Sequence, residues 1–342
     1  MNNIYLRTKK SWQLPIVPIN QNLNPFQKQN VQLWGVLGYR LPYGTMKIFA
    51  VLSLLQHAKK LGKLKNVKRL IEATSGAYGL VLAQFAKDID FNVPEVVLVM
   101  NKDILPGKKL PPLYAGAIIM PPLEGLSTIA TARKLGGGGW KSDDEWNMAE
   151  DGTFNLDQYG NIASTWLYRD WMSPKIAKQI PQGFEILVSP VGTGGTIIGL
   201  SEYFRKKQPN VKIIGAMVAP GEKIPGGRSL ADMKEINLPW RSALDEIVEV
   251  ESIPAYLAAL QFQRHTGMMI GITSGEAYIA ALLTLRRYFQ EGKIDSLRKR
   301  KGQTINVLII FHDGFRPYGA SELPIPNEYL KSSAPMPWEL LW

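Results

Sequence analysis

A turn rich in glycine and threonine, placed between an apolar run and a helical segment, could bind a phosphate group. The turn, Gly192 to Thr196, follows the apolar run Ile186 to Val191, and a helical pattern begins directly after it. Glycines let backbone amides approach an anion, threonine hydroxyls add donors, and the positive end of a helix dipole favours negative charge. A tight strand-to-helix turn without a ligand is the alternative interpretation. The expected phosphate cup consists of Gly192, Thr193, Gly194, Gly195 and Thr196.

The residues around this turn argue against a nucleotide. A dinucleotide fingerprint starting at Gly192 requires glycine or alanine at position 197, where Ile197 stands. It also requires an acidic residue after the next strand, where the chain reads Val218 to Pro220. A nucleoside-triphosphate loop would end in Gly-Lys-Ser or Gly-Lys-Thr, which this turn does not. A cofactor with one phosphate is therefore favoured.

A second turn, Thr74 to Gly79, has the same design. It follows Leu70 and Ile71, contains hydroxyl and glycine residues, and precedes a helix that we expect to begin at Leu80. Backbone and hydroxyl donors in such a turn suit an oxyanion such as a carboxylate. Capping of the helix by threonine or serine, which needs no ligand, is the alternative.

Lys47 is a candidate nucleophile because of its surroundings. It is the only charged residue between Arg40 and Lys59, in a segment whose Phe49 and Leu52 are expected to be buried. A desolvated lysine loses its proton more readily, and the neutral amine is the form that attacks an aldehyde to form a Schiff base. An ordinary lysine at the edge of a buried helix is the alternative.

The elements that must position these residues alternate in the α/β manner from about residue 66 onward. Such alternation predicts mostly parallel sheets with helices on both faces, and ligands bind beyond the carboxyl ends of their strands. The glycine-rich stretch 136–161 interrupts the pattern as a domain crossover or a long excursion loop. Strands are expected at Val96–Met100, Ala117–Met120, Glu185–Val191, Lys212–Val218 and Asn306–Phe311; helices are expected at Gly79–Lys87, Ser127–Leu135, Ile197–Lys207, Pro254–His265 and Ser274–Phe289.

Composition excludes several kinds of site. The 342 residues contain no cysteine and three dispersed histidines, so we expect no disulfide and no metal site. The formal charge is +11, but the basic residues form scattered clusters without a nucleic-acid motif, and we expect no nucleic-acid partner. Because no apolar stretch approaches about 20 residues, and residues 1–10 lack the apolar centre of a signal peptide, we expect a cytoplasmic protein without a membrane partner.

Taken in order, the motifs resemble those of the pyridoxal-phosphate enzymes of the tryptophan synthase β family (fold type II), and most closely those of the cysteine synthases (O-acetylserine sulfhydrylases). Pro42 to Lys47 resembles Pro-x-Gly-Ser-x-Lys, Thr74 to Gly79 resembles Thr-Ser-Gly-Asn-Thr-Gly, and the phosphate loop reproduces the family's residues. Gln158 stands where the family has Gln-Phe or Gln-Tyr, and Gly271 to Gly275 resembles Gly-Ile-Ser-Ser-Gly. Five motifs in order are far more specific than any one of them.

The resemblance implies a role for each matching residue. Lys47 would carry pyridoxal 5'-phosphate and act in catalysis, and Thr273 would meet the pyridine nitrogen. Ala77 stands where the family has an asparagine that contacts the cofactor's phenolic oxygen, and Tyr78 replaces a threonine. We expect Tyr78 to narrow the substrate site or to supply a new hydroxyl there. The residues expected to bind the substrate carboxylate are Thr74, Ser75, Gly76, Tyr78 and Gln158.

The resemblance also implies the architecture. Two open, twisted, mostly parallel sheet domains, with helices on both faces, would hold the coenzyme in the cleft between them. The expected division is an N-terminal segment, 1–40, packing on the C-terminal domain, a smaller substrate-carboxylate domain, 41–160, and a larger phosphate domain, 161–322. A Pro- and Trp-rich tail, 323–342, would pack on its own domain or on a partner. The family resemblance further suggests a homodimer.

The implied reaction acts on a small amino acid. Elimination of a β-leaving group would give an aminoacrylate, to which sulfide or another nucleophile adds in a cysteine-synthase-like replacement. A homologue in secondary metabolism that uses another O-activated serine also fits the departures at Ala77 and Tyr78. The alternatives are a lyase or deaminase of the same fold, such as a cysteine desulfhydrase, and a non-catalytic homologue that binds a partner.

Overall fold

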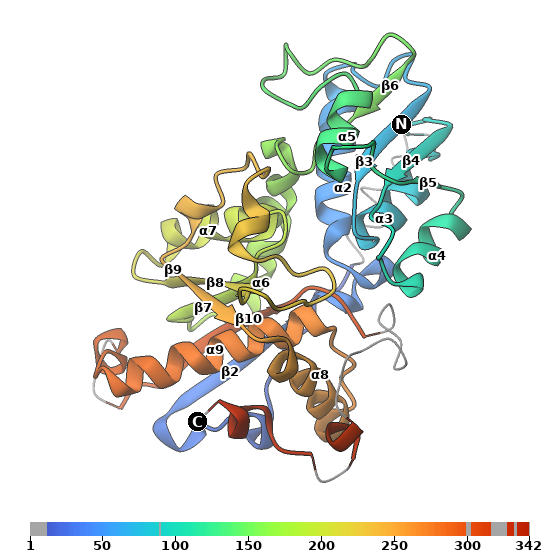
Figure 1. Ribbon diagram of the computed structural model, residues 1–342. Coiled ribbons are helices and arrows are strands. Elements are labelled where there is room, and N and C mark those ends of the chain that lie inside the picture. The colour runs from blue at the N-terminus through green and yellow to red at the C-terminus, as the bar shows by residue number, and fades with distance from the viewer. Residues whose placement is uncertain (1–11, 89, 299–301, 316–326, 332–333, 342) are drawn as a thin grey trace.

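The structure, a computed structural model, describes residues 12–88, 90–298, 302–315, 327–331 and 334–341. Two β-sheets lie in different parts of the molecule, each accompanied by helices (Figure 1). The α/β class with two mostly parallel sheets, predicted from the sequence, is confirmed. Among the described residues, no helix has both the length and the apolar character that crossing a bilayer requires.

The larger sheet has six strands in the order β1-β2-β10-β7-β8-β9, and only the β1–β2 pair is antiparallel. Successive side chains along its strands point to opposite faces of the sheet, and each face packs into a separate apolar core. Leu187 belongs to one core, whereas its neighbours Ile186 and Val188 belong to the other. The strands are β1 (Ile16–Pro18), β2 (Val31–Leu37), β7 (Ile186–Pro190), β8 (Lys212–Val218), β9 (Glu246–Val250) and β10 (Ile305–Phe311).

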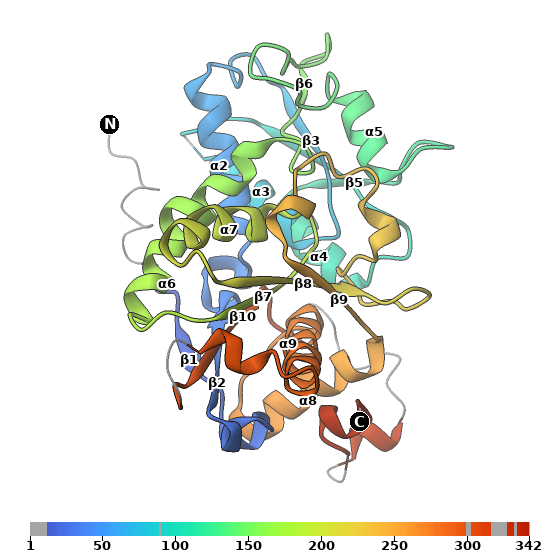
Figure 2. The ribbon, with the colours of Figure 1, turned by 90° about the vertical axis from the view of Figure 1, so that its left-hand side faces the viewer.

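Helices cover both faces of this sheet (Figure 2). Residues of α8 and α9 form one core with Ile186 and Val188, and residues of α7 belong to the other core with Leu187. A single π-helical turn, Tyr168–Met172, leads into α6. The helices are α6 (Ser173–Gln179), α7 (Gly195–Lys207), α8 (Ser252–Thr266) and α9 (Ile272–Gln290).

The smaller sheet is entirely parallel, in the order β5-β4-β3-β6. Gly79 of α3 packs against Leu98 of β4, whereas Gly136, which follows α5, packs against Ile71 of β3 on the opposite side. Its elements are α2 (Lys47–Lys60), β3 (Arg69–Ala73), α3 (Ala77–Ala86), β4 (Glu95–Val99), α4 (Pro106–Tyr114), β5 (Ile118–Met120), α5 (Thr128–Leu135) and β6 (Thr153–Asn155).

The irregular and terminal segments pack on these sheets. The stretch 136–161 returns to the smaller sheet through β6, so it contains an excursion loop. Strands β1 and β2 join the larger sheet beside β10. In the tail, Trp338 packs on the core that contains α8 and α9, and Gln261 donates to the carbonyl of Ala334 at 3.1 Å. Expectations for residues 1–11, 316–326 and Trp342 fall outside the described residues.

Glu72 is a buried carboxyl group in the middle of the smaller sheet. It lies in β3, is 1% exposed, and accepts hydrogen bonds from the Asn155 side-chain amide and the Gln158 backbone amide, each at 3.3 Å. Burial, together with the negative charge of Asp157, raises the pKa of Glu72 to about 8. At neutral pH the folded protein therefore holds a proton on Glu72, whereas the unfolded chain, in which a glutamate has its ordinary pKa, has already released it.

This proton predicts a pH-dependent loss of stability. The contribution of Glu72 is complete below the ordinary pKa of a glutamate and is lost as pH rises through about 8. Over that window the free energy of unfolding should fall by about 1.4 kcal/mol per pH unit from this group. Urea denaturation between pH 5 and 8 should show this slope reduced in Glu72→Gln. Parallel curves for the two proteins would mean that Glu72 is ionised in the folded state.

Candidate active site

Lys47 is the first residue of α2, and the segment before it fixes where that helix begins. Tyr43 and Gly44 adopt left-handed backbone conformations, with φ of 64° and 69°, and turn the chain sharply. The Met46 amide then donates to the carbonyl of His312 at 3.2 Å, and the Tyr168 hydroxyl donates to the Met46 carbonyl at 2.9 Å. These bonds tie the start of the helix to Tyr168 and to His312, which follows β10 of the larger sheet.

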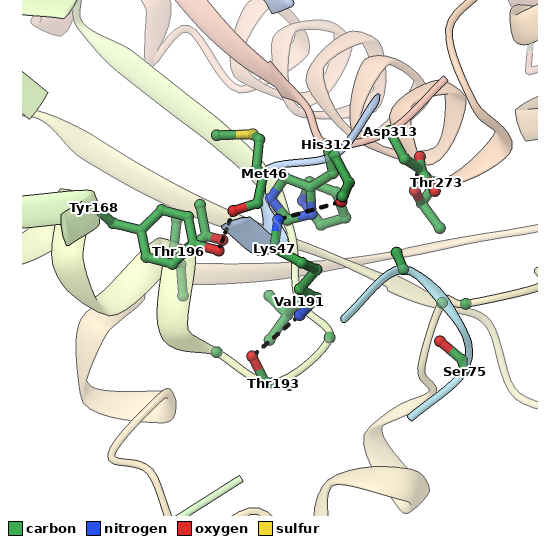
Figure 3. A pocket seen from close by; sticks show the side chains of 18 of the residues that line it. Met46, Lys47, Ser75, Tyr168, Val191, Thr193, Thr196, Thr273, His312 and Asp313 are labelled. Atoms are coloured by element: carbon green, nitrogen blue, oxygen red, sulfur yellow. Dashed lines mark hydrogen bonds between the residues drawn. The ribbon is translucent and has the colours of Figure 1, made fainter. Parts of the chain in front are cut away.

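The side chain of Lys47 points into a cavity between the two sheets, toward the predicted phosphate loop (Figure 3). Its Nζ lies 3.5 Å from Thr193 Oγ1. Burial and the positive charge of Arg228 lower the pKa of Lys47 to about 8, and Asp313 partly opposes this shift. The neutral, nucleophilic amine is therefore accessible near physiological pH.

The predicted phosphate loop forms another wall of the same cavity. Gly192, Thr193, Gly194 and Thr196 line it, and Gly195 begins the thirteen-residue helix α7. Gly194 has φ +85°, and a Cβ there would lie 2.5 Å from the Trp240 Cβ, so glycine is required. The first turn of α7 carries no acidic residue, which leaves the positive end of the helix dipole uncompensated by side chains.

The second turn borders the cavity through only some of its residues. Ser75 and Ala77 line it, and Gly76 lines an adjoining hollow. Thr74 is 6% exposed, and its Oγ1 accepts from the amides of Gly76 at 3.0 Å and Gly79 at 3.3 Å, as in the capping alternative. The expected start of the helix at Leu80 is wrong: α3 begins at Ala77, because Gly76, with φ +130°, makes the turn earlier.

Tyr78 and Gln158 lie behind the cavity wall. Tyr78 is 1% exposed, and its side chain is close enough to Glu72 for that carboxyl group to raise the pKa of the phenol, after the larger effect of burial. Gln158 is 2% exposed and donates to the carbonyl of Ala73 at 2.7 Å. Neither residue is among those lining the cavity, so their roles as substrate contacts stay predictions.

Thr273, in the first turn of α9, also lines the cavity. Its hydroxyl donates to Asp313 Oδ1 at 2.8 Å. His312, the neighbour of Asp313, also lines the cavity, and burial together with the positive charge of Lys47 lowers its pKa to about 3. The imidazole of His312 is therefore neutral.

Sequence reasoning missed several residues that line this cavity, among them the ionisable residues Lys108, His312 and Asp313. The last two follow β10 directly, and polar residues at the carboxyl end of a buried parallel strand are a usable signal. No such signal marked Lys108. It lies in α4, and the two prolines inside this helix make its sequence look non-helical. The Nζ of Lys108 donates to the carbonyl of Pro225 at 2.8 Å, so it links α4, beside the smaller sheet, to the segment that follows β8 of the larger sheet.

A buried lysine faces a loop rich in glycine and threonine, in a cavity between two mostly parallel sheets, and this arrangement points to a class of protein. The model of the pyridoxal-phosphate dependent enzymes matches residues 11–295, and the chain belongs to this family. The cysteine synthase of Buchnera aphidicola (subsp. Acyrthosiphon pisum) is 27% identical over 286 residues, covering 77% of this chain and 86% of that protein.

Two solved structures share the fold. The cysteine synthase of Entamoeba histolytica superposes with a TM-score of 0.76 at 20% identity, covering 99% of this chain and 96% of that one. A hydrogen sulfide-producing enzyme of Fusobacterium nucleatum gives 0.73 at 21% identity, covering 90% and 97%.

Membership of this family implies pyridoxal phosphate as the cofactor, and the chemistry of the cavity fits it. Lys47 offers an amine with a lowered pKa for an aldehyde. The phosphate loop offers amides, hydroxyls and a helix N-terminus for an anion, and the space in front of Gly192 is open, with no atom within 4 Å of a Cβ placed there. The amine and the anion site lie on one cavity, as a single cofactor requires.

Proposed function

We propose that this protein catalyses β-replacement on a small amino acid, with an O-activated serine as donor and sulfide or another nucleophile as acceptor. The observation that carries the proposal is the shared cavity of Lys47, the phosphate loop and Ser75. The name of the Buchnera relative, cysteine synthase, supports the same reaction class. A dimeric assembly and a role in amino-acid metabolism belong to this proposal.

Each group of residues has a proposed role that follows from its place in the cavity. Gly192 to Thr196 would hold the phosphate of the coenzyme, and Thr273 would lie at its pyridine end. Ser75 and the backbone amide of Ala77, the first residue of α3, would bind the substrate carboxylate. Lys47, with its lowered pKa, would take the proton from the α-carbon and return it. When bound, the coenzyme supplies the electron withdrawal that makes this proton acidic.

The test follows the fate of three amino acids. The protein loaded with pyridoxal phosphate is incubated separately with O-acetylserine, O-phosphoserine and cysteine, with and without sulfide, and the products are identified by mass. We expect cysteine to form from an O-activated serine only when sulfide is present. Formation of pyruvate and ammonia regardless of sulfide would instead identify a lyase or deaminase. No conversion of any of the three would contradict the proposal.

A further inference from the structure

A second hollow adjoins the cofactor cavity on the side of the smaller domain. We call it the apolar annex and define it by the side chains that form most of its wall. The two hollows share four lining residues, Thr45, Ala77, Lys108 and Asp313, so they border one another. The apolar wall consists of Tyr43, Ala77, Leu80, Pro111 and Pro112.

Local sequence explains why the annex exists. Ala77 contributes one methyl group, and Gly76 and Gly107 contribute no side chain, so the space between α3 and α4 stays open. Leu80 lies three residues after Ala77 and therefore on the same face of α3. Proline rings at positions 111 and 112 of α4 present hydrocarbon to the annex.

The outer boundary of the annex is an aromatic ring. Tyr43 is 42% exposed and packs edge-on against Phe85, with ring centroids 5.4 Å apart. Its backbone adopts a left-handed conformation, with φ of 64°, shortly before α2, the helix that begins at Lys47. The annex thus runs from the reaction cavity toward the surface.

Polar groups lie where the annex meets the cofactor cavity, and apolar groups line the rest of the annex. Lys108 is held there by the carbonyl of Pro225, and Asp313 by the hydroxyl of Thr273. A molecule that reaches from Lys47 into the annex would place its reacting atoms beside these polar groups and its far end against hydrocarbon. Sulfide and acetate have no part that would fill such a space.

Accepting the proposed β-replacement, we propose that the annex binds the hydrocarbon part of the incoming nucleophile, and that this nucleophile is an alkyl or aryl thiol. In the reaction with O-acetylserine, the bond between the β-carbon and oxygen breaks and a bond between the β-carbon and sulfur forms. The thiol proton leaves with the acetate as acetic acid, and the product is an S-substituted cysteine. No oxidant or reductant is needed.

The first arm of the test measures chain-length dependence. The holoenzyme and O-acetylserine are supplied with sulfide, ethanethiol, butanethiol or hexanethiol, and kcat/KM is measured for each nucleophile. We expect kcat/KM to rise about fourfold for each methylene that enters the annex, until the annex is full. Equal values for all four nucleophiles would overturn the inference while leaving the proposed function intact.

Variants then locate the effect. Leu80→Trp should fill the annex, lowering kcat/KM for hexanethiol at least tenfold while changing the sulfide reaction less than twofold. Leu110→Trp, the same replacement at a 43% exposed position of α4 outside the annex, should change neither. Tyr43→Ala should shift the preference toward longer thiols. Equal losses for sulfide and hexanethiol in Leu80→Trp would overturn the assignment.

A binding measurement makes the inference independent of turnover. Dissociation constants of S-hexylcysteine and S-methylcysteine for the holoenzyme are measured by calorimetry. We expect the hexyl compound to bind more tightly than the methyl compound. Leu80→Trp should lose this preference. If that variant does not fold, Tyr43→Ala provides the test, because it should shift the preference toward longer chains. If the preference appears without catalysis, the annex stands and the proposed reaction fails; if no preference appears, the annex inference fails.

Discussion

Replacing Lys47 by alanine should abolish covalent attachment of pyridoxal phosphate and lower turnover about 1,000-fold or more. The reason is the placement of its amine, 3.5 Å from Thr193 in the phosphate loop, with a pKa lowered to about 8. After incubation with the coenzyme and reduction with borohydride, the intact mass of the natural protein should rise by one coenzyme, and the mass of the variant should not.

The control lies on the same helix. Lys60 is an exposed lysine at the last position of α2, and Lys60→Ala should leave both the mass change and the turnover unaltered. Peptide mapping should find the reduced coenzyme on Lys47. Attachment in Lys47→Ala at the other cavity lysine, Lys108, accompanied by normal turnover, would show that the catalytic amine is wrongly assigned.

A negative charge in the phosphate loop should weaken coenzyme binding about 100-fold or more, because two anions would lie within a few ångströms in a partly buried site. Gly192→Asp is suited to this test: a Cβ there has no atom within 4 Å. The protein without coenzyme should keep its stability to within about 1 kcal/mol, since an acidic group is favoured near the start of α7.

The matched control for this replacement is Gly192→Asn, which has the same shape without the charge. Equilibrium dialysis with pyridoxal phosphate measures both dissociation constants. We expect the asparagine variant to bind at least tenfold more tightly than the aspartate variant. Equal affinities would indicate that the loop does not face the phosphate group.

About half of the regular elements were predictable because their patterns are local; strands β2, β3 and β9, for example, were not predicted. The five strands and five helices expected from apolar periodicity appear with boundaries shifted by a few residues at most. Helix α4 was missed because Pro111 and Pro112 lie inside it, and proline normally breaks a helix. The short edge strand β6 was missed because three residues carry almost no periodic signal.

The parts of the site that a sequence motif positions through the backbone were predictable. The orientation of individual side chains was not. Lys47 and the phosphate loop meet as expected. Tyr78 does not enter the cavity, because its ring packs in the core near Glu72. The orientation of this ring depends on how α3 packs against β3, and the spacing of residues within the loop does not reveal that packing.

The pairing of β2 with β10 has a consequence for how the protein is made. Val31 lies beside Ile305, so β2 finds this partner only after the whole smaller sheet and most of the larger sheet have been synthesised. The smaller sheet, by contrast, uses strands between residues 69 and 155 and can assemble while the ribosome is still working. Until the last strand emerges, β2 stays unpaired along that edge, a stage at which the nascent chain is exposed to aggregation and to chaperones.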